Sequence, residues 1–234
     1  MEATIASDKD RFPQTVFCLD SKGANPGKMF SWLTQTLLPS RCLLCEVPLE
    51  GGVACRRCLE ALPWWREAPL LKPWGRIYPC WHYRFPIREV IQRCKYGRQI
   101  ALARFLGELM AERFFQEGAP RPEAIVPVPL HPRRERERGF NQSGEIAGVV
   151  ARRLGVPLLE AVERVRDTPP QAGLSREARR HNLKGAFRVG RAVPRARIVL
   201  LDDVVTTGAT LSELATALQR SGAAAIDAWV CAAA

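Results

Sequence analysis

The segment over residues 198–210 constrains the fold of this chain more than any other part of the sequence. It reads Ile-Val-Leu-Leu-Asp-Asp-Val-Val-Thr-Thr-Gly-Ala-Thr. Four consecutive apolar residues are typical of a strand buried on both faces, as in a parallel sheet covered by helices. The carboxylates of Asp202 and Asp203 follow, and then a hydroxyl-rich turn opens a helix. The segment therefore predicts an open α/β sheet with polar side chains at the carboxyl end of a strand, where such folds bind ligands.

Strand and helix patterns alternate along the chain from residue 77 onward. We predict strands over 77–83, 124–128, 198–201 and 225–231, and helices over 87–96, 101–115, 141–154 and 211–221. Asn141 and Gly155 are expected to cap the third of these helices at its two ends. Regular alternation of this kind predicts a mainly parallel sheet flanked by helices.

The residues that follow the apolar run at 198–201 have distinct chemical uses. Two adjacent carboxylates are acceptors suited to the vicinal hydroxyls of a ribose. The turn after them offers hydroxyls and backbone N–H groups that suit a phosphate. The residues of this turn are Thr206, Thr207, Gly208, Ala209 and Thr210. The alternative is an ordinary strand end with a capped helix, which leaves the adjacency of the two acids unexplained.

A second polar segment follows the strand predicted over 124–128. It carries Arg133, Arg134, Arg136 and Arg138, and the helix expected to begin at Asn141 comes next. Guanidinium groups bind phosphate oxygens in pairs, and a helix start adds backbone donors. We therefore interpret the segment as an anion-binding loop. A solvated, charged turn is the alternative interpretation.

These motifs together resemble the ComF/GntX family. The resemblance is carried by Val-Pro-Leu-His-Pro-Arg-Arg at 128–134, by Arg-Gly-Phe-Asn-Gln at 138–142 and by the acid pair of 198–210, and it covers about residues 30–231. Members of the family are amidophosphoribosyltransferase-like and are linked to DNA uptake, competence and DNA utilisation. The resemblance implies a type I phosphoribosyltransferase fold that binds 5-phosphoribosyl-1-pyrophosphate (PRPP).

The resemblance also implies roles for individual residues. Asp202 and Asp203 would hold the ribose hydroxyls, the turn at 206–210 the 5′-phosphate, and Mg²⁺ the pyrophosphate. The arginine segment, above all Arg133, Arg134 and Arg138, would bind the same pyrophosphate. Residues 164–184 correspond to a hood that closes over PRPP, although they are equally interpretable as ordinary polar surface. The hood residues expected to reach the substrate are Thr168, Gln171, Arg176, Arg179, Arg180 and Asn182.

Four cysteines near the amino end have the spacing of a zinc site. Cys42 and Cys45 form one Cys-x-x-Cys pair, and Cys55 and Cys58 form a second one after nine intervening residues. Two such pairs complete a closed tetrahedral Zn²⁺ site with a structural role. Disulfides or a redox pair are the alternatives. The other four cysteines, Cys18, Cys80, Cys94 and Cys231, are expected to be isolated buried thiols.

Composition divides the chain into four parts. We expect a disordered leader over 1–28, a helix and zinc-binding module over 29–62, a linker rich in Pro and Trp over 63–76, and the phosphoribosyltransferase domain over 77–234. Met29 is the start that we expect in the natural protein. A length of 234 residues allows one large core and one small appendage.

The charge and hydropathy of the chain narrow the range of its partners. A formal net charge of +11 favours polyanions, although arginine on solvated surfaces would give the same value. No apolar stretch approaches the roughly 20 residues that span a bilayer, and no signal-peptide pattern is present. We therefore expect a cytoplasmic protein without membrane insertion.

Two hypotheses of function follow. In the first, the protein is a Mg²⁺-dependent enzyme that transfers phosphoribosyl from PRPP to an acceptor and releases pyrophosphate. In the second, it is a non-catalytic accessory protein that senses PRPP or binds nucleic acid during DNA uptake and transformation. Its partners would then be single-stranded DNA or a DNA-uptake helicase.

Overall fold

The computed structural model describes residues 40–49, 52–167, 183–190 and 193–234. The chain forms two compact units, Met1–Leu59 and Glu60–Ala234. The leader expected over 1–28 and the helix expected after it lie outside the described residues, so both stay predictions.

The described part of the first unit is small. Its elements are β1 (Ser40–Arg41), β2 (Pro48–Leu49) and the helix α2 (Arg56–Glu60), whose last residue lies just past the unit boundary. The two strands pair in antiparallel fashion. Cys42, Ala54 and Leu59 are its buried apolar residues among those described. So small a core needs a further source of stability, such as a bound metal.

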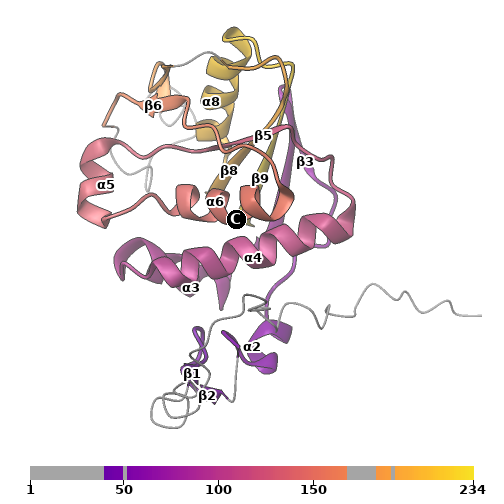
Figure 1. The fold of residues 1–234 in the computed structure, drawn as a ribbon, viewed down its shortest axis with the longest axis vertical. Helices are drawn as coiled ribbons and strands as arrows, with labels where there is room; N and C mark the ends of the chain where they lie inside the picture. Colours follow the sequence, from indigo (N-terminus) through magenta and orange to yellow (C-terminus); the bar gives the residue numbers. More distant parts are fainter. Residues whose placement is uncertain (1–39, 50–51, 168–182, 191–192) are drawn as a thin grey trace, which may run out of the picture. The chain divides into compact units, whose positions relative to one another are not determined.

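A five-stranded sheet organises the second unit (Figure 1). Its strands, in spatial order, are β3 (Leu70–Lys72), β4 (Gly75–His82), β9 (Ala225–Ala233), β8 (Arg197–Val205) and β5 (Ala124–Pro127). The edge pair β3–β4 is antiparallel, whereas β4–β9, β9–β8 and β8–β5 are parallel. The prediction of a mainly parallel sheet flanked by helices is confirmed.

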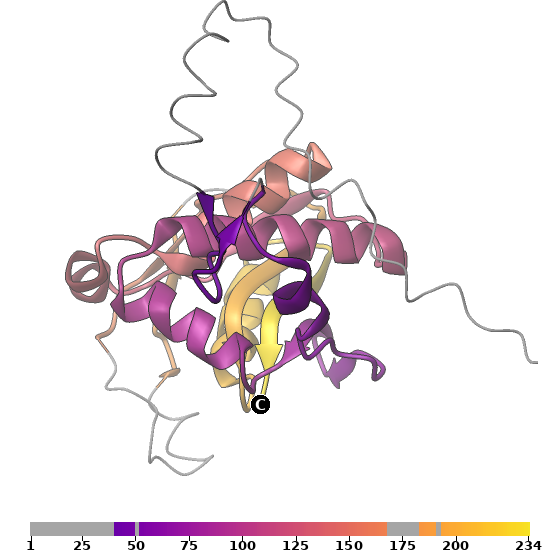
Figure 2. The ribbon, with the colours of Figure 1, turned by 90° about the horizontal axis from the view of Figure 1, so that it is seen from below.

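Helices cover both faces of this sheet. The helices described in the second unit are α3 (Ile87–Tyr96), α4 (Ile100–Glu117), α5 (Pro132–Arg138), α6 (Gln142–Leu154) and α8 (Ala209–Arg220). In Figure 1, α8 packs on one face while α4 and α6 lie on the other, and Figure 2 shows α3 and α4 lying across the strands. Asn141 Oδ1 accepts a hydrogen bond from Ser143 N at 3.1 Å, and Gly155 ends α6 with a φ of 64°. Both predicted caps of α6 are therefore confirmed.

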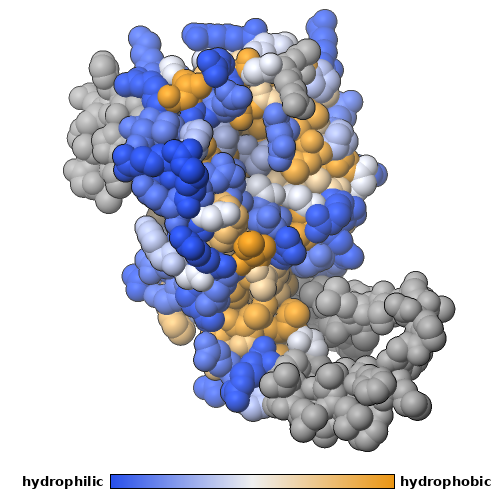
Figure 3. Space-filling view, turned by 60° about the vertical axis from the view of Figure 1, so that its left-hand side comes forward, coloured by the Kyte–Doolittle hydropathy of each residue, from blue (hydrophilic) through white to orange (hydrophobic). Residues whose placement is uncertain are grey.

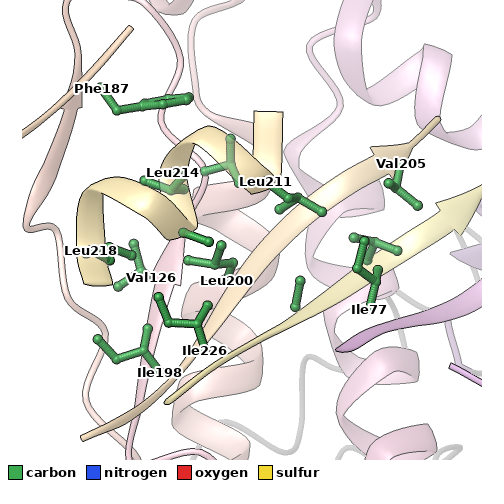
Figure 4. Close-up of a cluster of buried hydrophobic side chains, with 14 of the residues drawn as sticks. Ile77, Val126, Phe187, Ile198, Leu200, Val205, Leu211, Leu214, Leu218 and Ile226 are labelled. Atoms are coloured by element: carbon green, nitrogen blue, oxygen red, sulfur yellow. The ribbon is translucent and has the colours of Figure 1, made fainter. Parts of the chain in front are cut away.

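The core is built from strand side chains that alternate between the two faces. On one face Leu200 and Ile226 pack against Leu214 of α8, as Figure 4 shows. On the other face the ring of Trp229 stacks on Phe114 of α4, with 4.1 Å between ring centroids. The four apolar residues predicted to form a buried strand are all 0% exposed. Strand β8 is therefore held from both sides, which makes its carboxyl end a rigid support.

The strand β8 is longer than predicted. We expected it to end at Leu201, but it continues to Val205. Its neighbour β9 keeps pairing along this extension, with Asp202 opposite Val230 and Val205 opposite Ala233. The two aspartates therefore lie within the last four residues of a paired strand, and the loop begins only after Val205.

The segment expected as a linker over 63–76 lies in the second unit. Its last part forms β3 and the start of β4, which add an antiparallel hairpin to the sheet edge. Trp74 Nε1 donates a hydrogen bond to Ser212 Oγ of α8 at 2.9 Å. The rings of Trp64 and Trp81 lie 5.2 Å apart between centroids. Side chains distant in sequence thus attach this segment to the α/β unit.

The arginine segment after β5 was expected as a loop, but it forms the short helix α5. The helix begins at Pro132, where His131 Nδ1 accepts a hydrogen bond from Arg133 N at 3.3 Å, and it ends before Gly139 at a φ of 87°. Arg133 Nε and Glu137 Oε1 form an ion pair one turn apart at 3.0 Å. No residue of α5 is buried. Because the helix has no apolar face, its sequence lacks the hydrophobic periodicity that would predict a helix.

An antiparallel ribbon flanks the segment predicted as a hood. Its strands are β6 (Val162–Arg164) and β7 (Phe187–Val189). The hood residues Thr168, Gln171, Arg176, Arg179, Arg180 and Asn182 all lie outside the described residues, so their roles stay predictions.

Two further expectations concern the cysteines and the membrane. Cys80, Cys94 and Cys231 are buried thiols without a disulfide, as expected, while Cys18 lies outside the described residues. They are not isolated, because Cys80 and Cys231 are neighbours across the paired strands β4 and β9. In the described part of the chain, no helix has both the length and the apolar character required to cross a membrane.

Candidate functional site

The carboxyl edge of the parallel sheet borders a cavity of ≈ 160 Å³. Residues of α3, α5, α6, β6 and the end of β8 line it. Its charged lining residues are Lys95, Arg134, Arg138, Arg164, Asp202 and Asp203. Four cations face two carboxylates, so the cavity favours an anionic ligand.

Asp202 and Asp203 each have one carboxylate oxygen engaged within the protein. Asp202 Oδ1 accepts hydrogen bonds from Ser143 Oγ at 3.0 Å and from Asp203 N at 2.9 Å. Asp203 Oδ2 forms an ion pair with Lys95 Nζ at 2.9 Å. Within the described residues, no hydrogen bond reaches the other oxygen of either carboxylate. Each carboxylate therefore keeps one acceptor oxygen available to a ligand in the cavity that both residues line.

Burial and charge shift the proton affinities of these groups. Burial, reinforced by the neighbouring Asp203 carboxylate, raises the pKa of Asp202 to about 7. Burial lowers the pKa of Lys95, but the carboxylates of Asp203 and Asp202 outweigh it, and the pKa ends above its usual value. Lys95 thus stays a cation at neutral pH, whereas the pKa of Asp202 lies near neutrality.

We expect the stability of the protein to depend on pH through Asp202. Its folded-state pKa of about 7 exceeds the ordinary value of 3.8, so its stabilising contribution is complete below about pH 4 and lost as the pH rises through 7. Relative to Asp202→Asn, the wild type should lose about 3 kcal/mol of unfolding free energy between pH 5 and pH 8. Urea unfolding followed by tryptophan fluorescence measures this, because five of the six tryptophans lie in the second unit. Parallel pH profiles for the two proteins would contradict the assignment.

A second, smaller cavity of ≈ 60 Å³ lies against the turn at 206–210. All five turn residues predicted from the sequence line it. Gly208 adopts a left-handed conformation with a φ of 78°, and Thr207 Oγ1 accepts a hydrogen bond from Ala209 N at 3.3 Å. The cavity therefore lies at the start of the 12-residue helix α8, whose first N–H groups lack partners within the helix and attract anions.

The two cavities share a wall formed by Asp202, Val204 and Thr210. One extended ligand with two anionic ends can therefore occupy both. Asp202 lies in the shared wall, whereas Asp203 lines the larger cavity only.

The arginines predicted to bind anions are placed differently from one another. Arg134 and Arg138 line the larger cavity, and Arg138 donates a hydrogen bond to Gln142 Oε1 at 3.0 Å. Arg133 is not among its lining residues and forms an ion pair with Asp167 at 2.9 Å. The structure thus brings two of the three arginines to the carboxylate pair.

Lys95 and Arg164 line the same cavity. Lys95 was not predicted as a site residue, and Arg164 was included only as the first residue of the predicted hood. Arg164 is 8% exposed and lies over the Phe187 ring at 5.7 Å from its centroid. Burial and the nearby Arg134 cation lower the pKa of Arg164. The alternation Val162-Glu163-Arg164 places Arg164 on the same side of β6 as an apolar residue, and this was the available signal. No local signal distinguishes Lys95 from other helical lysines.

The four predicted metal-binding cysteines come together in the first unit. Their sulfur atoms all lie within 4.8 Å of one another, and Cys45 Sγ and Cys55 Sγ are 3.7 Å apart. Tetrahedral zinc with Zn–S bonds of about 2.3 Å separates its sulfurs by about 3.8 Å. Burial raises the pKa of Cys42, but backbone N–H groups, including that of Cys55 at 3.3 Å, outweigh it and lower the pKa to about 6. The cluster is compatible with a zinc site.

Comparison with known proteins identifies relatives at the level of sequence. No protein-family model matches the chain. It is 36% identical over 196 residues to the DNA utilization protein YhgH of Salmonella typhi, which covers 81% of this chain and 82% of the relative. It is 36% identical over 203 residues to competence protein F of Haemophilus influenzae, covering 80% and 88%. Competence protein ComFC of Bacillus subtilis is 27% identical over 185 residues, covering 79% and 73%.

Two solved structures show weaker likeness. One is a glutamine PRPP amidotransferase from B. subtilis, with 20% identity, a TM-score of 0.37 and coverage of 55% of this chain and 25% of that one. The other is a purine phosphoribosyltransferase from Pyrococcus horikoshii, with 19% identity, a TM-score of 0.34 and coverage of 58% and 73%. Scores this low do not establish kinship, which rests on the sequence relatives. Because the chain is 36% identical to such relatives over about four fifths of its length and theirs, it belongs to the ComF/GntX family.

Proposed function

We propose that the second unit binds PRPP at the carboxyl edge of its sheet and transfers the phosphoribosyl group with release of pyrophosphate. The observation that carries this proposal is the acid pair. Each aspartate offers one uncommitted oxygen: Asp202 lies in the wall between a turn cavity and a cation-lined cavity, and Asp203 lines the cation-lined cavity. A pentose with vicinal hydroxyls between two phosphate groups matches that order of donors and acceptors.

Each part of PRPP has a counterpart in this site. The 5′-phosphate occupies the ≈ 60 Å³ cavity, where the turn supplies hydroxyls and N–H groups. The ribose hydroxyls donate to the acid pair. The pyrophosphate extends into the larger cavity, whose cations are Lys95, Arg134, Arg138 and Arg164. The excess of cations over carboxylates balances part of the charge that the pyrophosphate brings.

The reaction breaks the bond between the anomeric carbon and a pyrophosphate oxygen. The electron pair of that bond leaves with pyrophosphate, while a nucleophilic acceptor, of the amine or nucleobase class, forms the new bond and releases its proton to solvent or to a pyrophosphate oxygen. The guanidinium groups of Arg134 and Arg138 stabilise the charge that develops on the leaving group. Carboxylate oxygens and phosphates are the ligands that Mg²⁺ prefers, so the site fits a Mg²⁺ carried in by pyrophosphate, which would neutralise further charge.

The four-cysteine cluster is proposed to hold a structural Zn²⁺. All four ligands come from the protein, so no position stays open for substrate. Thiolate ligands require reducing conditions, which is why we place the protein in the cytoplasm.

A second candidate function is supported by the relatives. Two of them are called a DNA utilization protein and a competence protein. The chain has a net charge of +11, and hydrophilic residues are interspersed with hydrophobic ones on the face in Figure 3. In this version the protein senses PRPP without catalysis, and it binds single-stranded DNA or a helicase with an affinity that falls as salt rises.

Pyrophosphate release distinguishes the two functions. We expect the wild type with PRPP, Mg²⁺ and a panel of amines and bases to release pyrophosphate at least ten times faster than the reaction without protein, because an enzyme exceeds the uncatalysed rate by far more. The double variant Asp202→Ala/Asp203→Ala is the control and should show only the uncatalysed rate. No release with any acceptor, together with salt-sensitive DNA binding that the double variant retains, would favour the accessory function.

A further inference from the structure

The cavity proposed for the 5′-phosphate lacks a cation of its own. None of the described residues that line it is Lys, Arg or His, and Asp202 adds a carboxylate to its wall. A phosphate monoester carries a charge between −1 and −2 at neutral pH. Among the lining residues, only backbone N–H groups and hydroxyls can therefore stabilise the negative charge of the phosphate, and they do so next to the carboxylate of Asp202. A cation outside the lining would add to this stabilisation.

Lys72 lies directly behind this lining. It is the last residue of the edge strand β3, and its Nζ donates a hydrogen bond to the carbonyl oxygen of Thr207 at 3.2 Å. Its Cε lies 3.1 Å and its Nζ 3.5 Å from the position where Gly208 would carry a Cβ. The lysine side chain thus packs against Gly208. A residue with a side chain at position 208 would crowd the lysine, so the contact depends on glycine there.

The hydrogen bond to Thr207 fixes the orientation of one peptide group. The Thr207 carbonyl and the Gly208 N–H belong to the same planar trans peptide, so they point in opposite directions. With the carbonyl held by Lys72, the N–H points away from the lysine, and Gly208 is one of the residues that line the cavity. Within the described part of the chain, this N–H donates no hydrogen bond to the protein.

Because residue 208 is a glycine, the orientation of the 207–208 peptide needs such a contact to hold it. Gly208 has a φ of 78°, and a glycine at such a position passes between backbone conformations at little cost. Rotation of the 207–208 peptide would turn a carbonyl oxygen toward a bound phosphate and repel it. The hairpin that carries Lys72 is itself attached to α8, because Trp74 Nε1 bonds Ser212 Oγ at 2.9 Å.

We propose that Lys72 is a positioning residue for the phosphate-binding turn and supplies the positive charge that its cavity lacks. The β3–β4 hairpin is then part of the ligand site, although its sequence belongs to the segment expected as a linker. This inference rests on the proposed function, because it assumes that the turn binds the phosphate of a phosphopentose.

The test compares two ligands that occupy different halves of the site. Titration calorimetry of the full chain with ribose 5-phosphate and with pyrophosphate is carried out on the wild type, Lys72→Met, Lys72→Arg and Leu71→Ala. Leu71 precedes Lys72 in the same strand and is 77% exposed, so its variant controls for damage to the hairpin. We expect Lys72→Met to raise the dissociation constant of ribose 5-phosphate about 10-fold, as for the loss of one charge-assisted hydrogen bond. The dissociation constant of pyrophosphate should rise less than 2-fold.

Lys72→Arg should restore most of the affinity for ribose 5-phosphate, because the guanidinium keeps both the charge and a donor. Leu71→Ala should bind both ligands like the wild type. The inference is overturned if Lys72→Met binds ribose 5-phosphate with the affinity of the wild type. It is also overturned if the variant loses affinity for both ligands equally, because a purely structural role of Lys72 would have that effect. If the wild type bound neither ribose 5-phosphate nor PRPP, the proposed function itself would be wrong and the inference with it.

Discussion

Replacing both aspartates of the acid pair with alanine is expected to weaken PRPP binding at least 100-fold. Each ribose hydroxyl would lose a hydrogen bond to a charged acceptor, worth about 1.5–3 kcal/mol. Two such losses give about 3–6 kcal/mol, which is on the order of 100-fold to 10⁴-fold in the dissociation constant. Titration calorimetry of PRPP into the variant Asp202→Ala/Asp203→Ala measures the effect.

The variant should remain folded, for two reasons. The backbone pairing of β8 with β9 does not involve the side chains of Asp202 and Asp203. Burial penalises the charge of Asp202 more than the attraction of Lys95 favours it, so removing that carboxyl costs little electrostatic stability. In the alanine variant, Lys95 loses its ion-pair partner Asp203. A second variant, Asp202→Asn/Asp203→Asn, therefore keeps the side-chain volume and a hydrogen-bond acceptor next to Lys95. Circular dichroism and thermal unfolding check the fold of both.

A matched control removes two carboxylates elsewhere in the same unit. Glu108 and Glu112 lie one turn apart on α4 and pair with Arg153 at 3.3 and 3.6 Å. Glu108→Ala/Glu112→Ala changes the net charge by the same amount without touching the cavity lining, and should bind PRPP like the wild type. Unchanged PRPP affinity in both aspartate variants would refute the proposed site.

Local patterns in the sequence identified the central parts of the fold and the site. The apolar run of β8 predicted a strand buried on both faces, because only helix-covered strands lack polar alternation. The Asn141 and Gly155 caps of α6 were predictable because capping depends on residues within one turn of the helix end. The four cysteines were predictable as a group because each Cys-x-x-Cys pair is itself a local turn.

The features of the fold and the site that were not predicted depend on contacts between residues distant in sequence, which no local pattern reveals. Lys95 and Asp203 are over one hundred residues apart, yet they form an ion pair at 2.9 Å because α3 ends at the carboxyl edge of the sheet. The position of Lys72 likewise depends on the pairing of β3 with β4 and on the attachment of that hairpin to α8. The extension of β8 to Val205 follows from the length of its neighbour β9. Each depends on tertiary packing, which overrides local preference.

Removing the metal from the cysteine cluster is expected to unfold the first unit and leave the second intact. The buried apolar residues described there are Cys42, Ala54 and Leu59, too few to stabilise a fold on their own. A structural zinc contributes about 10–16 kcal/mol to the folding of small modules. We expect one zinc per chain by elemental analysis of wild-type protein purified without chelator, and less than a tenth of that in Cys42→Ser/Cys58→Ser.

Limited proteolysis separates the two units in the same experiment. In Cys42→Ser/Cys58→Ser, cleavage within residues 40–59 should become at least tenfold faster, because loss of the metal exposes the backbone there. The unit over 60–234 should resist the protease as in the wild type and keep its PRPP affinity, since its core and its carboxyl-edge cavities are formed by its own residues. Cys94→Ala, which removes a buried thiol of the second unit, is the matched control and should retain full zinc. Substoichiometric zinc in the wild type, or full zinc in the double variant, would show that the cysteine cluster does not hold the metal and that the first unit is stabilised in another way.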